Sequence, residues 1–393
     1  MAASGFEFGK LVELAPKIKK QSRTRSPYPR SGHCCACDNS NFYVFGGYNP
    51  TYEVIYHGEP LVLQNELFKE LWYYNFSTGV WSLELDSTGN IPLETASMSM
   101  VMSGNNLLLF GGTSFPWGAR SNNDVYVYNV KQKCWSKLQC TGNVPPAKYG
   151  QAMALHKDNL YVFGGCRKIT DDHFHFDAEL YKLNLDTCIW EMLSDEEQGG
   201  DMHPRGMYRH GIACDEQRMY VLGYSWIEVY TVPTLQKICA YNFSEKRWER
   251  LDTQPDPTEG FPRTRIYHSC AQRNQEVYIS GGHNNSVIFN DLWKLHLPSL
   301  QWTKIHTVMP VPSFFHSAAI TPSGCMYYFG GVVNLDDSQR TGEICRIWLA
   351  VPSLFELCWH HVAALIPDLA SLSDERLITM GIPRSLIARV RAA

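Results

Sequence analysis

The stretch Phe42-Tyr43-Val44-Phe45-Gly46-Gly47 decides the fold, because its pattern recurs along the chain. In this pattern a short aromatic and β-branched run ends in two glycines. The pairs and near pairs are Gly46-Gly47, Gly111-Gly112, Gly164-Gly165, Gly223-Tyr224, Gly281-Gly282 and Gly330-Gly331. Their first glycines are 49 to 65 residues apart. A repeat of about 50 residues is typical of propeller blades and too long for most helical repeats.

Other landmarks keep the same spacing as the glycines. Thirteen or fourteen residues before each first glycine, a strand is expected to begin at His33, Ser97, Gln151, His210, His268 and His316. After the pairs come runs such as Leu71–Asn75, and a tryptophan follows nine residues beyond the second residue of the run, at Trp81, Trp135, Trp190, Trp248 and Trp302. These runs are β-branched or aromatic and bounded by turn residues, so they are predicted to be strands, four to a unit.

The units resemble the kelch repeat over roughly residues 30–351. The resemblance implies an all-β fold, a six-bladed kelch β-propeller, in which radial repetition leaves few exposed sheet edges. In the sixth unit, residues 347–351 are expected to form the third strand, and no tryptophan-bearing fourth strand follows. Residues 11–14, Leu-Val-Glu-Leu, resemble the fourth strands and are predicted to close the sixth blade. The alternative is that residues 1–29 form a disordered basic leader.

Composition restricts the class of protein. The 393 residues, 44% hydrophobic and 13% aromatic, can bury a large core of packed β-blades. A net charge of −4 gives no general attraction to nucleic acid. No apolar stretch approaches the ~18 residues of a membrane span, and the N-terminus lacks an apolar signal core, so no membrane contact is expected. Thirteen singly scattered cysteines suit a reducing compartment, the cytoplasm or also the nucleus.

Two groups of residues have side chains that bind metals elsewhere. Cys34, Cys35 and Cys37 would need a second ligand pair, and alternate residues of a strand point to opposite faces. Residues 171–177, Asp-Asp-His-Phe-His-Phe-Asp, follow the third glycine pair and are expected to be a solvated surface loop. No nucleophile elbow or phosphate loop is found. We therefore expect no metal, no cofactor and no catalytic residue, and an enzymatic propeller remains an alternative.

Basic and aromatic side chains gather at the entries to the predicted first strands. Because first strands are innermost in a propeller, these side chains are expected to ring the mouth of the central channel. The forked donors of arginine suit a planar terminal carboxylate as ligand. The predicted binding residues are Arg30, Lys148, Tyr149, Tyr208, Arg209, Arg263, Arg265, Tyr267 and Phe315, with Ser97 and Ser286 as further donors. In the second unit, Glu94 occupies the position at which other units carry a basic residue. The alternative is that the arginines pair with carboxylates between blades and only stabilise the fold.

Residues 352–393 are predicted to be helical. Pro352 suits a helix start, and Leu354, Leu357, Cys358, Val362 and Leu365 recur on one stripe. The pattern of a small residue, Leu, Cys and an aliphatic residue at these spacings matches the elongin C-binding box, which predicts elongin C contacts at Ser353, Leu354, Leu357, Cys358 and Val362. A later segment resembles the cullin-2 box and predicts cullin contacts at Ile382, Pro383, Leu386 and Val390.

The propeller, the two boxes and the run Arg340-Thr341-Gly342 together resemble the kelch domain-containing protein 10 family. The resemblance implies a noncatalytic substrate receptor of a ubiquitin ligase, with elongin C, elongin B and cullin-2 with its RING subunit as partners. It implies that the propeller captures the C-terminal tails, or C-degrons, of proteins for ubiquitination and proteasomal degradation. It also links the family to a protein phosphatase in stress-kinase signalling. The alternative is a kelch scaffold for signalling or the cytoskeleton, whose terminal helix caps the propeller.

Overall fold

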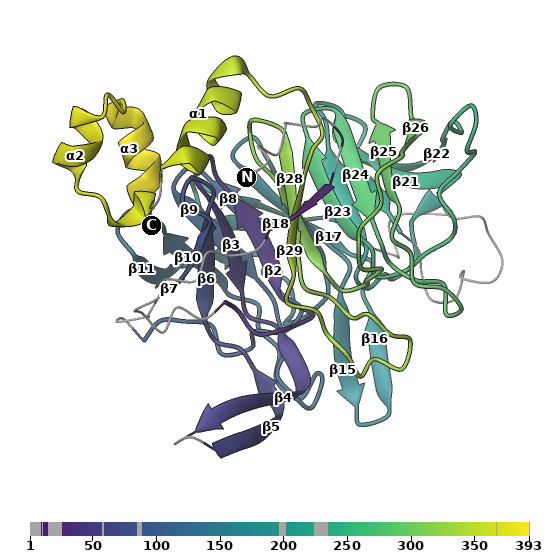
Figure 1. Ribbon diagram of the computed structural model, residues 1–393. Helices are drawn as coiled ribbons and strands as arrows, with labels where there is room; N and C mark the ends of the chain where they lie inside the picture. Colours follow the sequence, from purple (N-terminus) through teal and green to yellow (C-terminus); the bar gives the residue numbers. More distant parts are fainter. Residues whose placement is uncertain are drawn as a thin grey trace.

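The computed structural model describes residues 9, 11–14, 26–56, 59–84, 89–195, 202–223, 235–366 and 368–392. Its strands form antiparallel blades set around a central axis, which confirms the six-bladed β-propeller predicted from the repeats (Figure 1). A short helical segment follows the last blade. Within the described residues, no helix is both long and apolar enough to cross a membrane.

The first strand of each blade is innermost, and neighbouring first strands contact one another around the ring. Blade 1 contains β2 (Cys34–Cys37), β3 (Asn41–Phe45), β6 (Leu71–Asn75) and β7 (Val80–Glu84). Blade 2 contains β8 (Ser99–Ser103), β9 (Asn106–Phe110), β10 (Val125–Asn129) and β11 (Cys134–Lys137). Blade 3 contains β13 (Ala152–His156), β14 (Asn159–Phe163), β17 (Leu180–Asn184) and β18 (Ile189–Ser194), to which β12 (Thr141–Gly142) adds in parallel.

The remaining blades repeat this arrangement. Blade 4 contains β19 (Gly211–Cys214), β20 (Arg218–Leu222), β21 (Lys237–Asn242) and β22 (Arg247–Asp252). Blade 5 contains β23 (Ser269–Arg273), β24 (Glu276–Ser280), β25 (Leu292–His296) and β26 (Gln301–Ile305). Blade 6 contains β27 (Ser317–Ile320), β28 (Cys325–Phe329) and β29 (Ile344–Trp348). The recurring tryptophans lie on the fourth strands of blades 1 to 5, and all are buried between blades: Trp81, Trp135, Trp190, Trp248 and Trp302.

The fourth strand of blade 6 comes from the N-terminal part of the chain. β1 (Leu11–Glu13) pairs antiparallel with β29, and the Leu14 amide donates to the Ile344 carbonyl at 3.0 Å. This is the pairing expected of a blade-closing strand. The third strand of blade 6 differs from the predicted residues 347–351, because the chain leaves the sheet after Trp348 and Val351 is 74% exposed.

The glycine pairs lie where neighbouring blades approach most closely. Gly46 has a φ of 71°, and a Cβ at this position would lie 2.3 Å from the Thr95 carbonyl oxygen of blade 2. Only glycine fits both constraints. The Gly47 amide donates to the same carbonyl at 3.0 Å. Corresponding bonds join the second glycine of other pairs to the next blade: Gly112 to Lys148, Gly165 to Met207, Gly282 to Ser313 and Gly331 to Arg30. These glycine turns therefore tie each blade to the entry segment of the next.

A second contact between blades uses the histidines and glutamine at the predicted strand starts. Nε2 of His33 lies 3.1 Å from the Phe329 carbonyl oxygen of blade 6, and the Gln151 amide donates to the Phe110 carbonyl of blade 2 at 2.8 Å. The His210 ring packs edge-on against Phe163 of blade 3, with 5.3 Å between the ring centroids. Burial lowers the pKa of several of these rings, to about 3 for His210 and His268 and about 4 for His316. The histidines are therefore neutral in the folded protein.

These neutral histidines make the propeller sensitive to mild acid. An unfolded histidine has a pKa near about 6.5, so the unfolded chain binds protons that the folded chain excludes, and stability falls as the pH drops below about 6.5. Each histidine contributes a slope of about 1.4 kcal/mol per pH unit until its own folded pKa is reached. We expect His210→Gln to reduce the loss of stability between about pH 7 and about pH 5. The measurement is the urea midpoint of the full chain at both pH values. Glutamine is the matched replacement, because Gln151 holds this place in blade 3. Parallel pH dependence of the two proteins would contradict the expectation.

Two hairpins and the helical segment lie at opposite ends of the propeller (Figure 1). β4 (Tyr48–Tyr56) with β5 (Glu59–Leu67), and β15 (Cys166–Thr170) with β16 (His173–Phe176), each follow a glycine pair. The helical tail contains α1 (Leu354–Leu365), the 3-10 helix η2 (Leu369–Ser371), α2 (Asp374–Thr379) and α3 (Arg384–Arg391). It contacts the turns between strands at the other end, where the Trp359 indole donates to Ser77 Oγ at 3.0 Å.

Candidate functional site

The end of the propeller that carries the glycine pairs opens into a pocket of about 700 Å³, which we call the mouth pocket. Its size is typical of ligand-binding pockets. Several of the predicted binding residues line it: Ser97, Tyr149, Tyr208, Arg209, Tyr267 and Phe315. A narrower space of about 170 Å³ continues from it between the innermost strands.

The base of the mouth pocket is a ring of residues with left-handed backbone, one from each blade. They are Gly32, Ser97, Gly150, Arg209, Tyr267 and Phe315, with φ between 55° and 67°. Backbone hydrogen bonds link neighbours in the ring, from Ser97 to Gly32 and from Gly150 to Ser97 at 2.8 Å, and from Arg209 to Gly150 at 2.7 Å. Residues with side chains rarely adopt this conformation, and such strain concentrates at functional sites. The ring therefore holds Arg209, Tyr267 and Phe315 in fixed places at the channel mouth.

Arg209 supplies an unpaired positive charge in this ring. Its guanidinium donates to Ser97 Oγ and lies over the Phe315 ring, with Cζ 4.9 Å from the centroid. Its Nε is buried without a hydrogen-bond partner, its Nη1 donates to no described residue, and no carboxylate of the described residues contacts the group. Gly32 leaves space for it, because a Cβ there would lie 2.9 Å from an Arg209 terminal nitrogen. An arginine with open donors in a partly apolar pocket suits a carboxylate ligand.

Aromatic rings surround Arg209. Tyr208 meets Tyr149 edge-on at 5.7 Å and Tyr267 at 6.0 Å, and Tyr267 stacks on Phe315 at 4.1 Å, all between ring centroids. A second cation of the pocket, Arg340, is already occupied, because it donates to an Asp337 carboxylate oxygen at 2.7 Å and to Ser31 Oγ at 3.1 Å. The mouth pocket thus combines one available cation with an aromatic wall.

At the opposite end, α1 has two different faces. The inner face is buried, through Trp359 and Ala363. The outer face is apolar and exposed: Leu354 by 75%, Phe355 by 53% and Leu365 by 68%, with Cys358 and Val362 also exposed. The Ser353 hydroxyl caps the helix by accepting from the Glu356 amide at 3.3 Å. Predicted elongin C contacts therefore lie largely on the exposed face, although Leu357 is half-buried.

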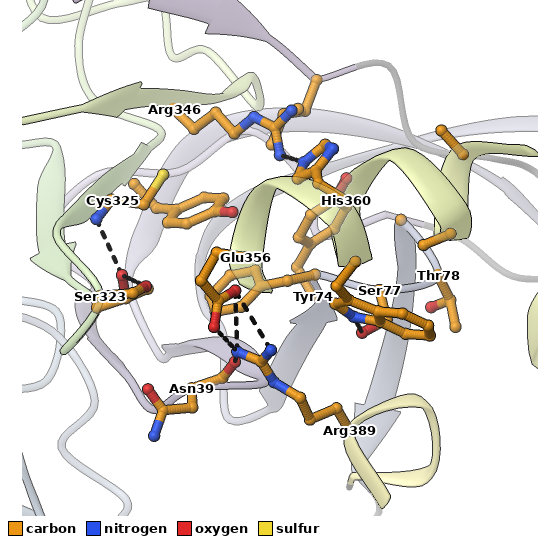
Figure 2. A pocket seen from close by; sticks show the side chains of 18 of the residues that line it. Asn39, Tyr74, Ser77, Thr78, Ser323, Cys325, Arg346, Glu356, His360 and Arg389 are labelled. Atoms are coloured by element: carbon orange, nitrogen blue, oxygen red, sulfur yellow. Dashed lines mark hydrogen bonds and ion pairs between the residues drawn. The ribbon is translucent and has the colours of Figure 1, made fainter. Parts of the chain in front are cut away.

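The helical tail is fixed to blades 1 and 6 around a pocket of about 170 Å³ (Figure 2). Glu356 of α1 and Arg389 of α3 form an ion pair at 2.9 Å, and Arg389 also donates to the Asn39 carbonyl at 2.9 Å. Arg346 of β29 contacts the His360 ring. Burial, with the Arg346 charge as a smaller cause, lowers the pKa of His360 to about 4. The tail therefore docks on the propeller with its ionic contacts directed inward.

Two of the four predicted cullin contacts are buried in the described structure. Leu386 and Val390 are buried in a small core of the tail, together with Trp359, Leu369 and Leu377. Their helical periodicity reflects packing within the tail. A helix that packs on its neighbours needs an apolar face, just as a helix that binds a partner does. Ile382 is half-buried and Pro383 is exposed. Exposed apolar side chains in this region that the prediction did not include are Ile378, 48% exposed, and Met380, 45% exposed.

Comparison with known proteins identifies the chain's relatives. A family model described as the Attractin/LZTR1 β-propeller matches residues 107–347. A protein named kelch domain-containing protein 10 from Xenopus laevis is 48% identical over 382 residues, which cover 97% of this chain and 90% of that protein. The Homo sapiens protein of that name is 47% identical over 388 residues, covering 97% and 85%, and a Drosophila melanogaster homologue is 36% identical over 391 residues, covering 93% and 62%. The chain belongs to the kelch domain-containing protein 10 family.

Membership of the kelch domain-containing protein 10 family, with its propeller fold, supports a role in protein interaction.

Three basic residues predicted to bind a ligand have another role, because their side chains are 0% exposed. Arg30 pairs with Glu70 at 2.6 Å, Lys148 with Asp177 at 2.5 Å, and Arg265 with Asp291 through two bonds at 2.5 and 2.9 Å. Arg30 and Arg265 also donate to the first glycine carbonyl of their own blade, at 3.0 Å in each case. These pairs lie within blades, not between them, and they hold the glycine turns.

Further predicted contacts fall outside the mouth pocket. Arg263 is exposed, with its guanidinium 5.9 Å from the Phe289 centroid, and Ser286 is exposed in the loop after the fifth glycine pair. Neither lines the pocket. In blade 2 the residue equivalent to Arg30 is Thr95, not Glu94. The Arg30 carbonyl accepts a hydrogen bond from the second glycine of blade 6, Gly331, and the Thr95 carbonyl accepts the corresponding bond from Gly47 of blade 1.

The predicted surface loop at 171–177 is in part a wall of the mouth pocket. Phe174 and Phe176 of β16 line the pocket, as do Tyr48 and Trp117, and the prediction included none of these four. The alternation of Phe174 and Phe176 with histidines was the available signal for a strand with one apolar face. The neighbouring group His175, Asp177 and Glu179 has ligand atoms within 4.8 Å of one another, but Arg167 pairs with Asp177 at 2.7 Å, so cations already occupy the carboxylates.

The two classes of arginine are expected to affect stability to different extents. Arg265→Met leaves the Asp291 carboxylate unpaired in a largely buried site, and we expect a loss of about 3–5 kcal/mol. Arg209→Met breaks no ion pair, so we expect a change within about 1 kcal/mol. Urea unfolding of the full chain at neutral pH measures both. Arg265→Lys is the matched control and should fall between them, since Lys148 holds this place in blade 3. Equal losses for Arg265→Met and Arg209→Met would contradict the assignment.

Proposed function

We propose that this chain is the noncatalytic substrate receptor of a ubiquitin ligase built on elongin B, elongin C and cullin-2 with its RING subunit. In this proposal the mouth pocket binds the C-terminal tail of a protein that is then ubiquitinated and degraded by the proteasome. The outer face of α1 binds elongin C. The observation that carries the proposal is this apolar face, exposed by up to 75% on a helix whose other face is already packed.

The two faces of α1 argue against a simple cap. A helix that only covers the propeller needs its inner face, which Trp359 and Ala363 supply. It has no need for Leu354, Phe355 and Leu365 on the solvent side, where exposed apolar clusters mark interaction surfaces. On the same helix, Ser353, Leu354, Cys358 and Val362 have the spacing of the elongin C-binding box. A partner that covers this face accounts for both the exposure and the pattern.

The proposed cullin contact uses a different surface from the one the sequence pattern indicated. Leu386 and Val390 hold the core of the tail, so they position α2 and α3. Pro383, Ile378 and Met380 remain exposed beside this core. We assign the cullin-2 contact to these residues, next to the elongin C site on α1.

The mouth pocket supports the substrate half of the proposal. A terminal carboxylate is the one negative charge that every protein tail carries, and the half-buried Arg209 side chain can donate to it through Nη1. The aromatic side chains around Arg209 suit the backbone and side chains of the last residues. The mouth pocket and the helical segment that carries α1 lie at opposite ends of the propeller, so a substrate and elongin C can be bound at the same time (Figure 1).

The elongin C contact can be tested directly. We expect purified elongin B–elongin C to bind the full chain, and the double variant Leu354→Ser, Cys358→Phe to abolish binding. Loss of the Leu354 contact alone is expected to weaken affinity by about ten- to a hundredfold, because burying a leucine contributes about 1.5–3 kcal/mol. Isothermal titration calorimetry measures both affinities. The matched control is Leu93→Ser, which changes a leucine 50% exposed on the propeller and should bind normally. Failure of the intact, folded chain to bind would overturn this half of the proposal.

The carboxylate site is tested with peptides. A library of ten-residue peptides with free carboxyl termini, randomised at the last three positions, is screened against the full chain, and selected sequences are resynthesised as amides. We expect amidation to weaken binding by about tenfold or more, because a charge-assisted pair contributes about 1.5–3 kcal/mol. Arg209→Gln should weaken the free acids and remove the difference between acid and amide. Equal binding of acids and amides by the intact chain would contradict the proposed site.

A further inference from the structure

One wall of the mouth pocket extends away from the blades along the hairpin β15–β16. Phe174 and Phe176 line the pocket, and their spacing of two places them on one face of the strand, while Asp172 and His173 line it near the turn of the hairpin. His175 and Asp177 take the other face, where Nε2 of His175 lies 3.4 Å from an Asp177 oxygen. Cys166, opposite Phe176 in the hairpin, also lines the pocket. The hairpin therefore directs its apolar face toward the mouth.

A second apolar surface adjoins this wall. The Tyr48 ring stacks on Phe115 at 5.9 Å and meets Trp117 edge-on at 4.7 Å, measured between ring centroids. The loop that carries Trp117 touches the hairpin, since a Cβ on Gly118 would lie 2.6 Å from Lys168 Cβ. Tyr48 and Trp117 both line the mouth pocket. With Phe174 and Phe176 they form a surface that we call the aromatic shelf.

The charged groups beside the aromatic shelf are largely neutralised by one another. Lys168 pairs with Asp171 at 2.8 Å, and Arg167 pairs with Asp177 at 2.7 Å. Arg340, which lies over the Tyr48 ring, pairs with Asp337. A shelf with largely paired charges and half-buried rings at Trp117, Phe174 and Phe176 favours apolar side chains over charged ones.

We propose that the aromatic shelf binds the three to four residues that precede the last three positions of the captured tail, and that it selects for apolar side chains there. This inference rests on the proposed function, because it takes the occupant to be the same polypeptide whose carboxylate binds Arg209. Continuity carries it: the shelf and the Arg209 site line one pocket, so a chain ending at Arg209 leaves over the shelf. The strand β16 spans four residues, about 13 Å at 3.3 Å per residue, and an extended peptide of equal length covers it.

The experiment compares two peptide libraries on the full chain. Both have free carboxyl termini and randomised last three positions. In the first, the preceding six positions are a glycine-serine spacer, and in the second they are randomised among Leu, Phe, Pro and Ser. We expect the second library to yield peptides that bind about tenfold more tightly or better, because covering one or two rings contributes about 1.5–3 kcal/mol. Fluorescence anisotropy of resynthesised peptides measures the affinities.

Variants locate the effect. Phe174→Ser and, independently, Trp117→Ser should remove the preference for apolar upstream residues and leave binding of the glycine-serine peptides unchanged. Ile169→Ser is the matched control, because Ile169 is 55% exposed on the same hairpin and does not line the pocket. It should keep the full preference. Equal affinity of the two libraries, or a preference that survives both shelf variants, would overturn the inference while acid-dependent binding still supported the proposed function. Absence of binding by both libraries would overturn both.

Discussion

The hydrogen bond from a glycine turn to the entry segment of the next blade is the constraint on which the propeller depends. At Gly46 and Gly47 two backbones come so close that no side chain fits, and the Thr95 carbonyl accepts the bond. In blade 1, Arg30 fixes the same junction from inside, through the Gly46 carbonyl and Glu70. This close approach of neighbouring blades sets how the blades pack, where the neutral histidines lie and what shape the mouth has.

The left-handed ring at the mouth is a consequence of the same geometry. In each blade the chain must turn sharply from the entry segment into the innermost strand. Gly32 and Gly150 adopt the left-handed backbone of this turn without strain. Ser97, Arg209, Tyr267 and Phe315 adopt it despite their side chains, which costs on the order of 1 kcal/mol or more each. Three of these four residues follow one another around the ring, in blades 4 to 6, where no carboxylate of the described residues pairs with Arg209. The asymmetry of the mouth is thus built into the backbone.

Sequence patterns predicted the blades better than the site. Glycine spacing, β-type runs and recurring tryptophans are local signals of a repeated backbone, so the six blades and the helical tail could be read directly. The roles of Arg30 and Arg265 could not, because pairing depends on Glu70 and Asp291, which lie 40 and 26 residues away. The acids directly before the third strands of blades 1 and 5 were visible only as isolated charges. Likewise, helical periodicity in α3 cannot distinguish a buried face from a binding face, so the burial of Leu386 could not be predicted from the pattern.

Closure of blade 6 by β1 determines where both ends of the described chain lie. Leu11 stands opposite Ile347, near the end of β29 from which the chain continues into α1, and α3 ends on the same side (Figure 1). A partner molecule that covers α1 therefore also approaches the described end at Leu11, whereas the mouth at the opposite end of the propeller stays open to solution.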